Sequence, residues 1–196
     1  MTATPDQALP FDFIVSDTHF YHKKIVEYEP MRVAWGSDSN LMSEHMIAEW
    51  NRVVPRDARV LHLGDFCLGN SELLHHVCSV LNGKVTLVHG NHDRKKTQLL
   101  SAGIAEVHTS LTFEANIRGV DWEVVCAHNP YHLREKYWPT DHPQRLYLHG
   151  HTHSLGYQAG TLPAGRGACA SVESINSPCP VPLSKFLEAI TAVAVQ

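Results

Sequence analysis

Short apolar runs of strand length recur along the chain, and each of them ends in a cluster of polar or turn-forming residues. Five such runs are residues 11–15, 60–63, 85–88, 123–127 and 146–148. Their length and their content of Val, Ile, Leu and Phe are typical of strands buried in a sheet. Because loops beyond the carboxyl ends of strands build the sites of α/β folds, we expect the polar clusters that follow these runs to meet in space.

Helical periodicity occupies two of the intervals between the apolar runs. Residues 39–51 place apolar side chains at helical spacing, with Ser39 or Ser43 as the expected N-cap. Residues 71–81 show the same spacing, and Gly83 follows as a helix stop. Both segments therefore predict helices whose apolar faces cover a sheet.

The second half of the chain carries a different pattern. Residues 111–117 and 122–127 predict a β-hairpin, a strand is expected near residues 168–172, and a closing helix is expected over residues 184–193 with Ser184 as its cap. Neither a repeat nor a dividing linker interrupts this order. The pattern therefore favours a single α/β domain.

Composition and charge limit what this domain can be. We expect one domain over residues 1–196, with residues 1–10 flexible. Lys and Arg total 16 against 20 Asp and Glu, for a net charge of −4, so no overall positive field attracts nucleic acid or an anionic membrane. The start of the chain lacks the pattern of a signal peptide, and no apolar run is long enough to span a bilayer. A cytoplasmic location with no membrane partner is the resulting expectation.

The cysteines give no sign of a functional site, whereas the histidines do. The five cysteines are odd in number and lack a Cys-x-x-Cys pair, which argues against a disulfide framework and a zinc ribbon and favours reduced, mostly buried thiols. Histidine occurs 15 times, and several of these residues follow the apolar runs. Since histidine is the commonest nitrogen ligand of transition metals, this clustering makes metal or acid–base chemistry the first hypothesis.

Polar motifs with metal-ligand character follow all five runs. Asp17-x-His19 places two ligands on one side of an extended segment, because side chains alternate along a strand end, and His151-x-His153 repeats that arrangement. Single donors follow the other three runs. The candidate ligands are Asp17, His19, Asp65, Asn91, His128, His151 and His153.

Seven oxygen and nitrogen donors exceed the needs of one tetrahedral ion, whereas two ions sharing a carboxylate would use them all. The mixed donor set favours two divalent transition-metal ions, with Mn expected and Fe, Zn, Ni or Co as alternatives. Two such ions with a bridging hydroxide keep a residual positive charge. They would activate water and clamp a phosphoryl group, so phosphoester hydrolysis is the chemistry that this inventory predicts.

The ordered motifs resemble those of the calcineurin-like metallophosphoesterases. That family is marked by Asp-x-His, Gly-Asp, Gly-Asn-His-Asp/Glu, a lone His and Gly-His-x-His, and the match runs from Asp17 to His153. The resemblance implies an α/β fold built as a four-layered α/β/β/α sandwich, in which two mixed sheets pack face to face between helices. It also implies Asp65 as the ligand shared by two metals, one held with Asp17, His19 and His153.

By the same resemblance the second metal takes Asn91, His128 and His151 besides the shared carboxylate. The residues implied as catalytic are His92, which protonates the leaving oxygen, and Asp93, which orients the imidazole of His92. An alkoxide leaving group needs a proton, and an imidazolium near pH 7 can donate one. The acid that many family members carry shortly after Gly-Asp is missing here, which affects tuning of the site rather than its ligands.

The expected substrate is a small phosphodiester or a nucleotide-type phosphoester, hydrolysed by attack of the bridging hydroxide. Cations follow three of the motifs and are candidates for rimming the crevice: Lys23, Lys24, Arg94, Lys95, Lys96, Arg134 and Lys136. The aromatic residues of the same segments are candidates for stacking a base: Tyr21, Tyr131, Tyr137 and Trp138. The alternatives are a nuclease on single-stranded nucleic acid, which the acidic balance disfavours, and a scaffold module that keeps the fold without catalysis. The physiological substrate, oligomeric state and protein partners stay open. His22 is expected on the surface or in a satisfied contact.

Overall fold

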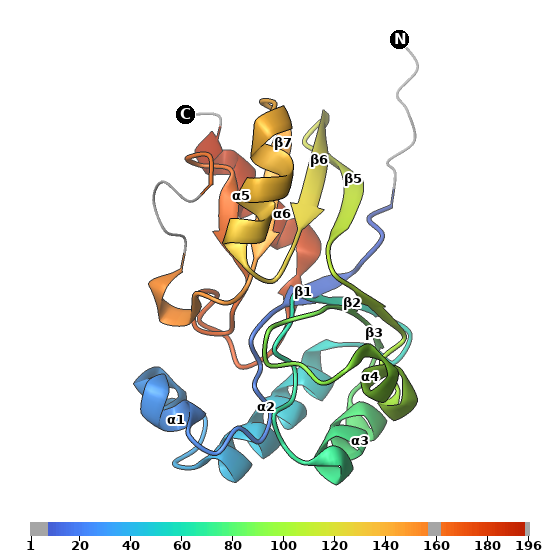
Figure 1. The fold of residues 1–196 in the computed structure, drawn as a ribbon, viewed down its shortest axis with the longest axis vertical. Helices are drawn as coiled ribbons and strands as arrows, with labels where there is room; N and C mark the ends of the chain where they lie inside the picture. The colour runs from blue at the N-terminus through green and yellow to red at the C-terminus, as the bar shows by residue number, and fades with distance from the viewer. Residues whose placement is uncertain (1–7, 157–161, 195–196) are drawn as a thin grey trace.

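The computed structural model describes residues 8–156 and 162–194. Residues 1–7 of the predicted flexible start lie outside these ranges. Two sheets with flanking helices form the molecule (Figure 1). The first has the order β4-β3-β2-β1-β9, with strands β4 (Glu106–His108), β3 (Lys84–Val88), β2 (Arg59–His62), β1 (Phe13–Val15) and β9 (Val181–Pro182). The second has the order β5-β6-β7-β8, with strands β5 (Leu111–Ile117), β6 (Val120–Cys126), β7 (Arg145–His149) and β8 (Gly167–Cys169).

Both sheets are mixed, as the family resemblance implies. Strands β1 to β4 are parallel to one another and β9 joins β1 antiparallel. In the second sheet β5 and β6 form the predicted antiparallel hairpin, while β6, β7 and β8 are parallel. The carboxyl ends of β1, β2 and β3 therefore lie at one edge of the first sheet, and those of β6 and β7 at one edge of the second.

Helices flank the two sheets. The helices are α1 (Ile25–Tyr28), α2 (Ser39–Val53), α3 (Ser71–Val80), α4 (Lys96–Ala102), α5 (Pro130–Tyr137) and α6 (Leu183–Ala194). Short 3-10 segments cover Pro30–Ala34, Trp138–Thr140 and His153–Leu155. Helices α2, α3 and α4 pack on the first sheet, and α5 packs on the second through Leu133 (Figure 1). The predicted order of layers is confirmed.

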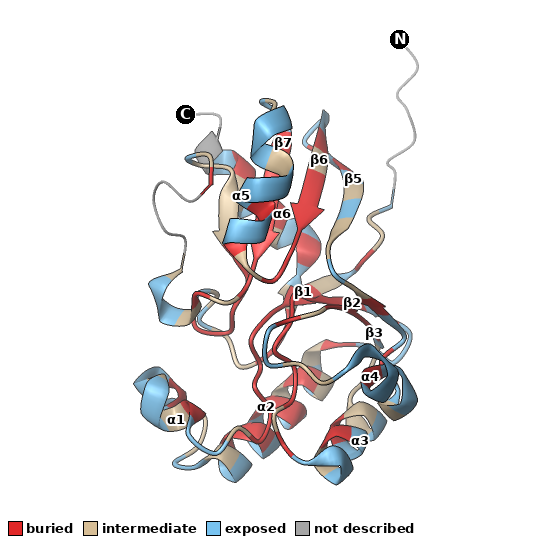
Figure 2. Ribbon diagram, viewed as in Figure 1, coloured by how far each residue is buried: buried red, intermediate tan, exposed pale blue. Residues whose placement is uncertain are grey.

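Alternation along the central strands divides the core between two faces. On β1, Val15 joins the cluster beneath α2 while Ile14 joins the cluster between the sheets, and Val60 and Leu61 divide in the same way on β2. After their first residues, both strands are buried (Figure 2). Burial on both faces explains why their sequences are uninterrupted apolar runs rather than alternating ones.

The helix ends correct two predictions. The N-cap of α2 is Asp38, whose carboxylate accepts hydrogen bonds from the backbone N–H groups of Asn40 and Leu41 at 2.9 and 3.0 Å, so neither Ser39 nor Ser43 is the cap. Aspartate caps as well as serine does, and it stands one residue ahead of the first helical position. Helix α6 begins at Leu183, so Ser184 lies inside its first turn and does not cap it.

All five cysteines are free, and four of them are buried while Cys78 is partly exposed, as predicted. Helix α6 packs Leu183 and Leu187 into the core between the sheets and contacts β1, β5 and β9. Among residues 8–156 and 162–194, no helix combines the length and the apolar character that crossing a bilayer requires.

Candidate metal centre

Five loops carry the candidate ligands, and each begins where a central strand ends. Asp17 and His19 follow β1, Asp65 follows β2, Asn91 follows β3, His128 follows β6, and His151 and His153 follow β7. Backbone hydrogen bonds join these loops directly. The N–H of Asp17 donates to the carbonyl of Gly64 at 2.9 Å, and the N–H of His19 donates to that of Asp65 at 3.0 Å. The loops after β1 and β2 therefore form one connected layer.

One half of the cluster gathers around the carboxylate of Asp17. His153 Nε2 lies 3.5 Å and His19 Nε2 3.8 Å from Asp17 Oδ1. The same His19 nitrogen lies 3.5 Å from Asp65 Oδ2. Three ligand atoms, from Asp17, His19 and His153, lie within 4.8 Å of one another, a spacing at which one cation can contact all of them.

The other half gathers around Asn91. His128 Nε2 lies 3.0 Å and His151 Nδ1 2.9 Å from Asn91 Oδ1. His128 Nε2 is also 3.3 Å from Asp65 Oδ2, the oxygen that faces His19. The structure thus brings all seven candidate ligands together, with the Asp65 carboxylate between the two halves.

The backbone at the ligands differs from the extended geometry that the sequence predicts. Five of the seven ligands have positive φ, in the left-handed region: Asp17 at 56°, His19 at 48°, Asp65 at 57°, His151 at 70° and His153 at 45°. The pairs Asp17/His19 and His151/His153 do reach one centre. They do so through tight loop conformations and not through alternation along a strand. Non-glycine residues adopt this region rarely and at a cost, and such strain concentrates at functional sites.

Burial leaves part of the cluster without ordinary partners. His19 is 3% exposed, and among the residues that the structure describes neither of its ring nitrogens has a hydrogen-bond partner. Burial raises the pKa of the Asp17 carboxyl, but the neighbouring imidazoles of His19, His128 and His153 outweigh burial and hold that pKa below its usual value. Ionised carboxylates beside unpartnered imidazole nitrogens are the donor set that a divalent transition-metal ion binds.

His92 lies next to the ligands without belonging to them. Its side chain is exposed, its ring centroid is 5.8 Å from that of His19, and its backbone N–H donates to Asp65 Oδ1 at 2.9 Å. An exposed imidazole beside the cluster can reach a group bound there. This placement suits proton transfer, because geometry is the first requirement of a general acid.

The Asp93 carboxylate contacts the backbone of two loops. Its Oδ2 accepts hydrogen bonds from the backbone N–H groups of Gly90 and Asp65 at 2.8 and 2.9 Å, and its Oδ1 accepts from that of Phe66 at 2.8 Å. Within the described part of the chain, no hydrogen bond joins the side chains of Asp93 and His92. Asp93 therefore ties the loop after β3 to the loop after β2, and its role in orienting the imidazole of His92 stays a prediction.

Three further residues of the site escape the sequence analysis. Arg32 and Glu173 form a fully buried ion pair, and Glu173 Oε1 lies 3.1 Å from His153 Nδ1. His22 is neither a surface nor a satisfied residue, since its ring centroid lies 5.6 Å from that of His19 and its Nδ1 is buried without a partner among the described residues. No local pattern marks Arg32 or Glu173, because 141 positions separate them.

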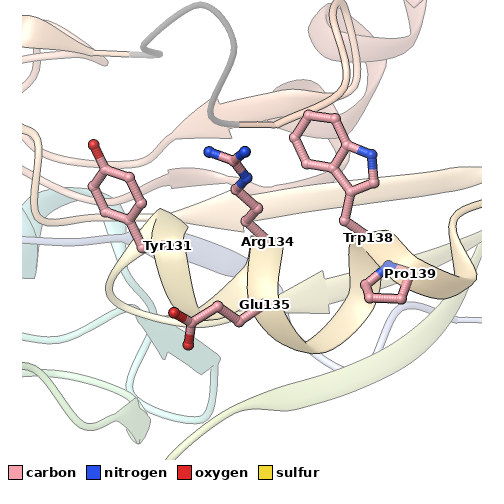
Figure 3. A pocket seen from close by; sticks show the side chains of 5 residues that line it. All are labelled: Tyr131, Arg134, Glu135, Trp138 and Pro139. Carbon is pink, nitrogen blue, oxygen red and sulfur yellow. The ribbon is translucent and has the colours of Figure 1, made fainter.

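An open groove runs along helix α5, which begins two residues after His128. Tyr131, Arg134, Glu135, Trp138 and Pro139 line it, and its volume is about 550 Å³. Figure 3 shows Tyr131, Arg134 and Trp138 projecting from the same side of the helix, with Glu135 turned away. Tyr131 is 50% and Trp138 36% exposed, and the Arg134 guanidinium carbon is 5.4 Å from the centroid of the Trp138 ring.

Comparison with known families decides what this arrangement is. The sequence model of the Calcineurin-like phosphoesterase superfamily domain matches residues 13–164, a stretch that contains all seven candidate ligands. The chain belongs to the calcineurin-like phosphoesterase superfamily. Its members are metal-dependent phosphoesterases, in agreement with the clusters of possible metal ligands described above.

Individual relatives add less than the superfamily does. An uncharacterized protein of Methanocaldococcus jannaschii is 26% identical over 160 residues, covering 76% of this chain and 86% of its own. The crystal structure of a protein of unknown function from Aquifex aeolicus superposes with a TM-score of 0.62 at 23% identity, covering 90% of this chain and 97% of that one, and it supports the fold. A structure described as a novel archaeal phosphodiesterase aligns with a TM-score of 0.40 at 17% identity over 81% of each chain, which is too slight a likeness for argument.

Proposed function

We propose that this calcineurin-like phosphoesterase is a two-metal enzyme that hydrolyses phosphodiesters or nucleotide-type phosphoesters. The observation that carries the proposal is the position of Asp65, whose Oδ2 faces His19 at 3.5 Å and His128 at 3.3 Å. A carboxylate oxygen placed between two imidazoles of separate clusters is suited to be shared by two cations. The residues that would hold them are Asp17, His19, Asp65 and His153 for one ion, and Asp65, Asn91, His128 and His151 for the other.

When bound, two divalent cations supply Lewis acidity that activates water and neutralises the charge of phosphoryl oxygens. The chain's own part is to position those cations and to serve the leaving group. Asp65 Oδ1 accepts a hydrogen bond from the backbone N–H of His92, so the residue shared by both halves also holds the backbone that carries the imidazole. His92 would hold a proton on its exposed ring and deliver it to the departing alkoxide.

Two substitutions separate metal binding from proton transfer. Asp65→Asn should lower the occupancy of both ions and abolish hydrolysis, whereas His92→Ala should keep both ions and lose turnover by roughly 100-fold or more. Elemental analysis and hydrolysis of a chromogenic phosphodiester with added Mn²⁺ measure the two effects. Exposed residues away from the cluster, changed as Asp57→Asn and His45→Ala, are matched controls.

Each outcome has a distinct meaning. Full activity in His92→Ala would refute the proposed role of His92 as proton donor, but it would not contradict the proposed metal centre. Two bound ions in the unmodified chain without hydrolysis of any phosphoester would favour the scaffold alternative instead.

The groove on α5 supports a substrate that carries a base. Its two exposed aromatic rings and the Arg134 guanidinium offer stacking surfaces and a positive charge on the helix that begins two residues after His128. Stacking of a base on an aromatic ring is worth about 1–3 kcal/mol. Adenosine monophosphate should therefore bind at least several-fold more tightly than ribose 5-phosphate, and Trp138→Ala should remove the difference. Equal binding of the two ligands in the unmodified chain would contradict a base-bearing substrate.

A further inference from the structure

Arg32 is completely buried although it carries a charge, and its contacts explain where that charge is used. The residue lies in the 3-10 segment Pro30–Ala34. Its Nη1 donates to the backbone carbonyl of Thr18 at 2.8 Å, and its Nη2 donates to that of Asp17 at 2.6 Å. One guanidinium therefore holds two successive carbonyl groups of the loop in which Asp17 has a positive φ.

The same guanidinium reaches the other end of the site through Glu173. Arg32 Nε donates to Glu173 Oε1 at 2.6 Å, and that oxygen is 3.1 Å from His153 Nδ1. The Glu173 side chain is fully buried. With Nδ1 facing Glu173, the opposite ring nitrogen of His153 faces Asp17 Oδ1 at 3.5 Å. A carboxylate on one ring nitrogen fixes the proton there and leaves the lone pair of the other nitrogen free for a cation.

The backbone around Glu173 holds His153 as well. The hydroxyls of Ser171 and Ser174 donate to the main-chain carbonyl of His153 at 3.2 and 2.8 Å. The segment from Ser171 to Ser174 thus contacts both the imidazole and the backbone of His153, whose φ is also positive. This segment carries none of the motifs by which the ligands were found.

We propose that Arg32 and Glu173 are positioning residues for the half of the metal centre formed by Asp17, His19 and His153. This inference rests on the proposed function, since it assigns residues to one of its two cation positions. A buried ion pair is a poor source of stability, because apolar residues of similar volume often serve as well. The pair instead joins the loop that follows β1 to the last histidine of the Gly-His-x-His motif.

The contacts of the pair predict a one-sided effect. Among the described residues, the side-chain hydrogen bonds of Arg32 and Glu173 go to each other, to the Asp17 loop, to His153 and to Met42 Sδ, and none goes to Asn91, His128 or His151. Loss of such outer partners typically lowers metal affinity by 10–100-fold. One of two cation sites should therefore weaken by roughly that factor while the other keeps its affinity.

The experiment is a calorimetric titration of Mn²⁺ into the full chain after chelation. The main variant is Arg32→Met with Glu173→Leu, which removes both charges and so leaves none buried alone. We expect two tight sites in the unmodified chain and one tight site in the double variant, the second being 10–100-fold weaker. Glu173→Gln keeps an oxygen that can accept from His153 Nδ1, so its loss should be smaller. Circular dichroism establishes that each variant is folded.

Glu123 provides a matched control, because it also bridges an arginine and a histidine. Its Oε2 lies 2.5 Å from Arg145 Nε and 3.0 Å from His142 Nε2, away from the site. Glu123→Gln should bind Mn²⁺ as the unmodified chain does. Glu29→Gln tests direct ligation, since ligand atoms of Glu29, His153 and Glu173 lie within 4.8 Å of one another. A positioning role predicts unchanged binding in that variant.

Three results would overturn the assignment. Unchanged affinity at both sites in the double variant and in Glu173→Gln would show that the pair is structural only. Equal weakening of both sites in a folded variant would contradict the one-sided effect. Weakening by Glu29→Gln equal to that by Glu173→Gln would make Glu173 a ligand. Failure of the unmodified chain to bind two ions would instead refute the proposed two-metal function itself.

Discussion

Asp93 offers the sharpest test of the site's construction, because the structure and the family resemblance assign it different tasks. The change is Asp93→Asn, which keeps the shape of the side chain and removes one acceptor oxygen. The carboxylate accepts three backbone N–H groups, two on Oδ2 and one on Oδ1. In the best amide orientation the oxygen keeps the N–H groups of Gly90 and Asp65, and the amide NH₂ meets the N–H of Phe66.

The magnitude follows from that count. A hydrogen bond to a charged acceptor contributes about 1.5–3 kcal/mol, and a buried N–H left unpaired costs about 1–3 kcal/mol. The substitution should therefore lower the free energy of unfolding by about 2–4 kcal/mol, a large share of the 5–15 kcal/mol that is typical of a domain. Urea denaturation followed by circular dichroism measures this loss as a lower midpoint.

A double-mutant cycle that combines Asp93→Asn with His92→Ala separates the two roles. If Asp93 acted by orienting the imidazole, Asp93→Asn would have no further effect on activity once His92 is removed. The geometry predicts instead that the loss of stability is the same in both backgrounds, because the three N–H groups belong to the loops after β2 and β3. A loss below about 0.5 kcal/mol, or one that disappears with His92→Ala, would refute this account.

Three further substitutions test the fold away from the site. Met46→Ala removes a fully buried side chain beneath the first sheet and should cost about 2–5 kcal/mol of unfolding free energy in a urea titration. Gly119→Ala places a Cβ in open space at φ 81°, so only backbone strain of roughly 1 kcal/mol should appear in the same assay. For Asp141, burial raises the pKa but the hydrogen bonds from Arg166 outweigh it and hold the pKa below its usual 3.8. Its stabilisation is therefore present above that pH and lost as the pH falls below it, so the melting temperatures of the unmodified chain and Asp141→Asn should converge in acid.

The central strands could be predicted from the sequence because burial on both faces leaves an unmistakable signature. Strands β2 and β3 coincide with the predicted apolar runs to within one residue at each end. The hairpin of β5 and β6 is marked by alternating apolar and polar residues and by its Arg118-Gly119 turn. The division of strands between two sheets came only from the family resemblance. Nothing in a single apolar run states which neighbour it pairs with.

Short elements were missed where tertiary contacts replace periodicity. Helix α4 spans only seven residues and buries Leu99 alone, so it shows no apolar stripe. Strand β9 is two residues long and contains Pro182, whose ring is tolerated because the strand lies at a sheet edge. Helix α5 begins at a proline behind Asn129, a start signal that the sequence analysis did not use.

The candidate ligands were found from their types and order, but the reason for their convergence was not. Alternation along an extended segment would have placed Asp17 and His19 on one side by itself, whereas the structure uses left-handed residues at both positions. Asp and His tolerate that region better than most residues do. A conformation of this kind depends on hydrogen bonds from other loops, and those partners are distant in the sequence.

Removal of metal tests whether the hydrogen bonds between the loops or the cations hold the site in shape. Five ligands in the left-handed region carry strain of about 1–3 kcal/mol each, which rivals the stability of a whole domain and must be opposed by other contacts. Hydrogen bonds described above supply these contacts. Arg32 donates to the Asp17 carbonyl, the Asp93 carboxylate accepts from three backbone N–H groups, and the His151 N–H donates to the Asp17 carboxylate at 3.0 Å. We therefore expect the chelated chain to keep its circular dichroism spectrum and a cooperative melting transition. Added Mn²⁺ should raise the melting temperature with concentration, because binding adds about 2.7 kcal/mol per site to the free energy of unfolding at 100 times the dissociation constant. A chelated chain without a melting transition would mean that the cations, and not these contacts, hold the loops in place.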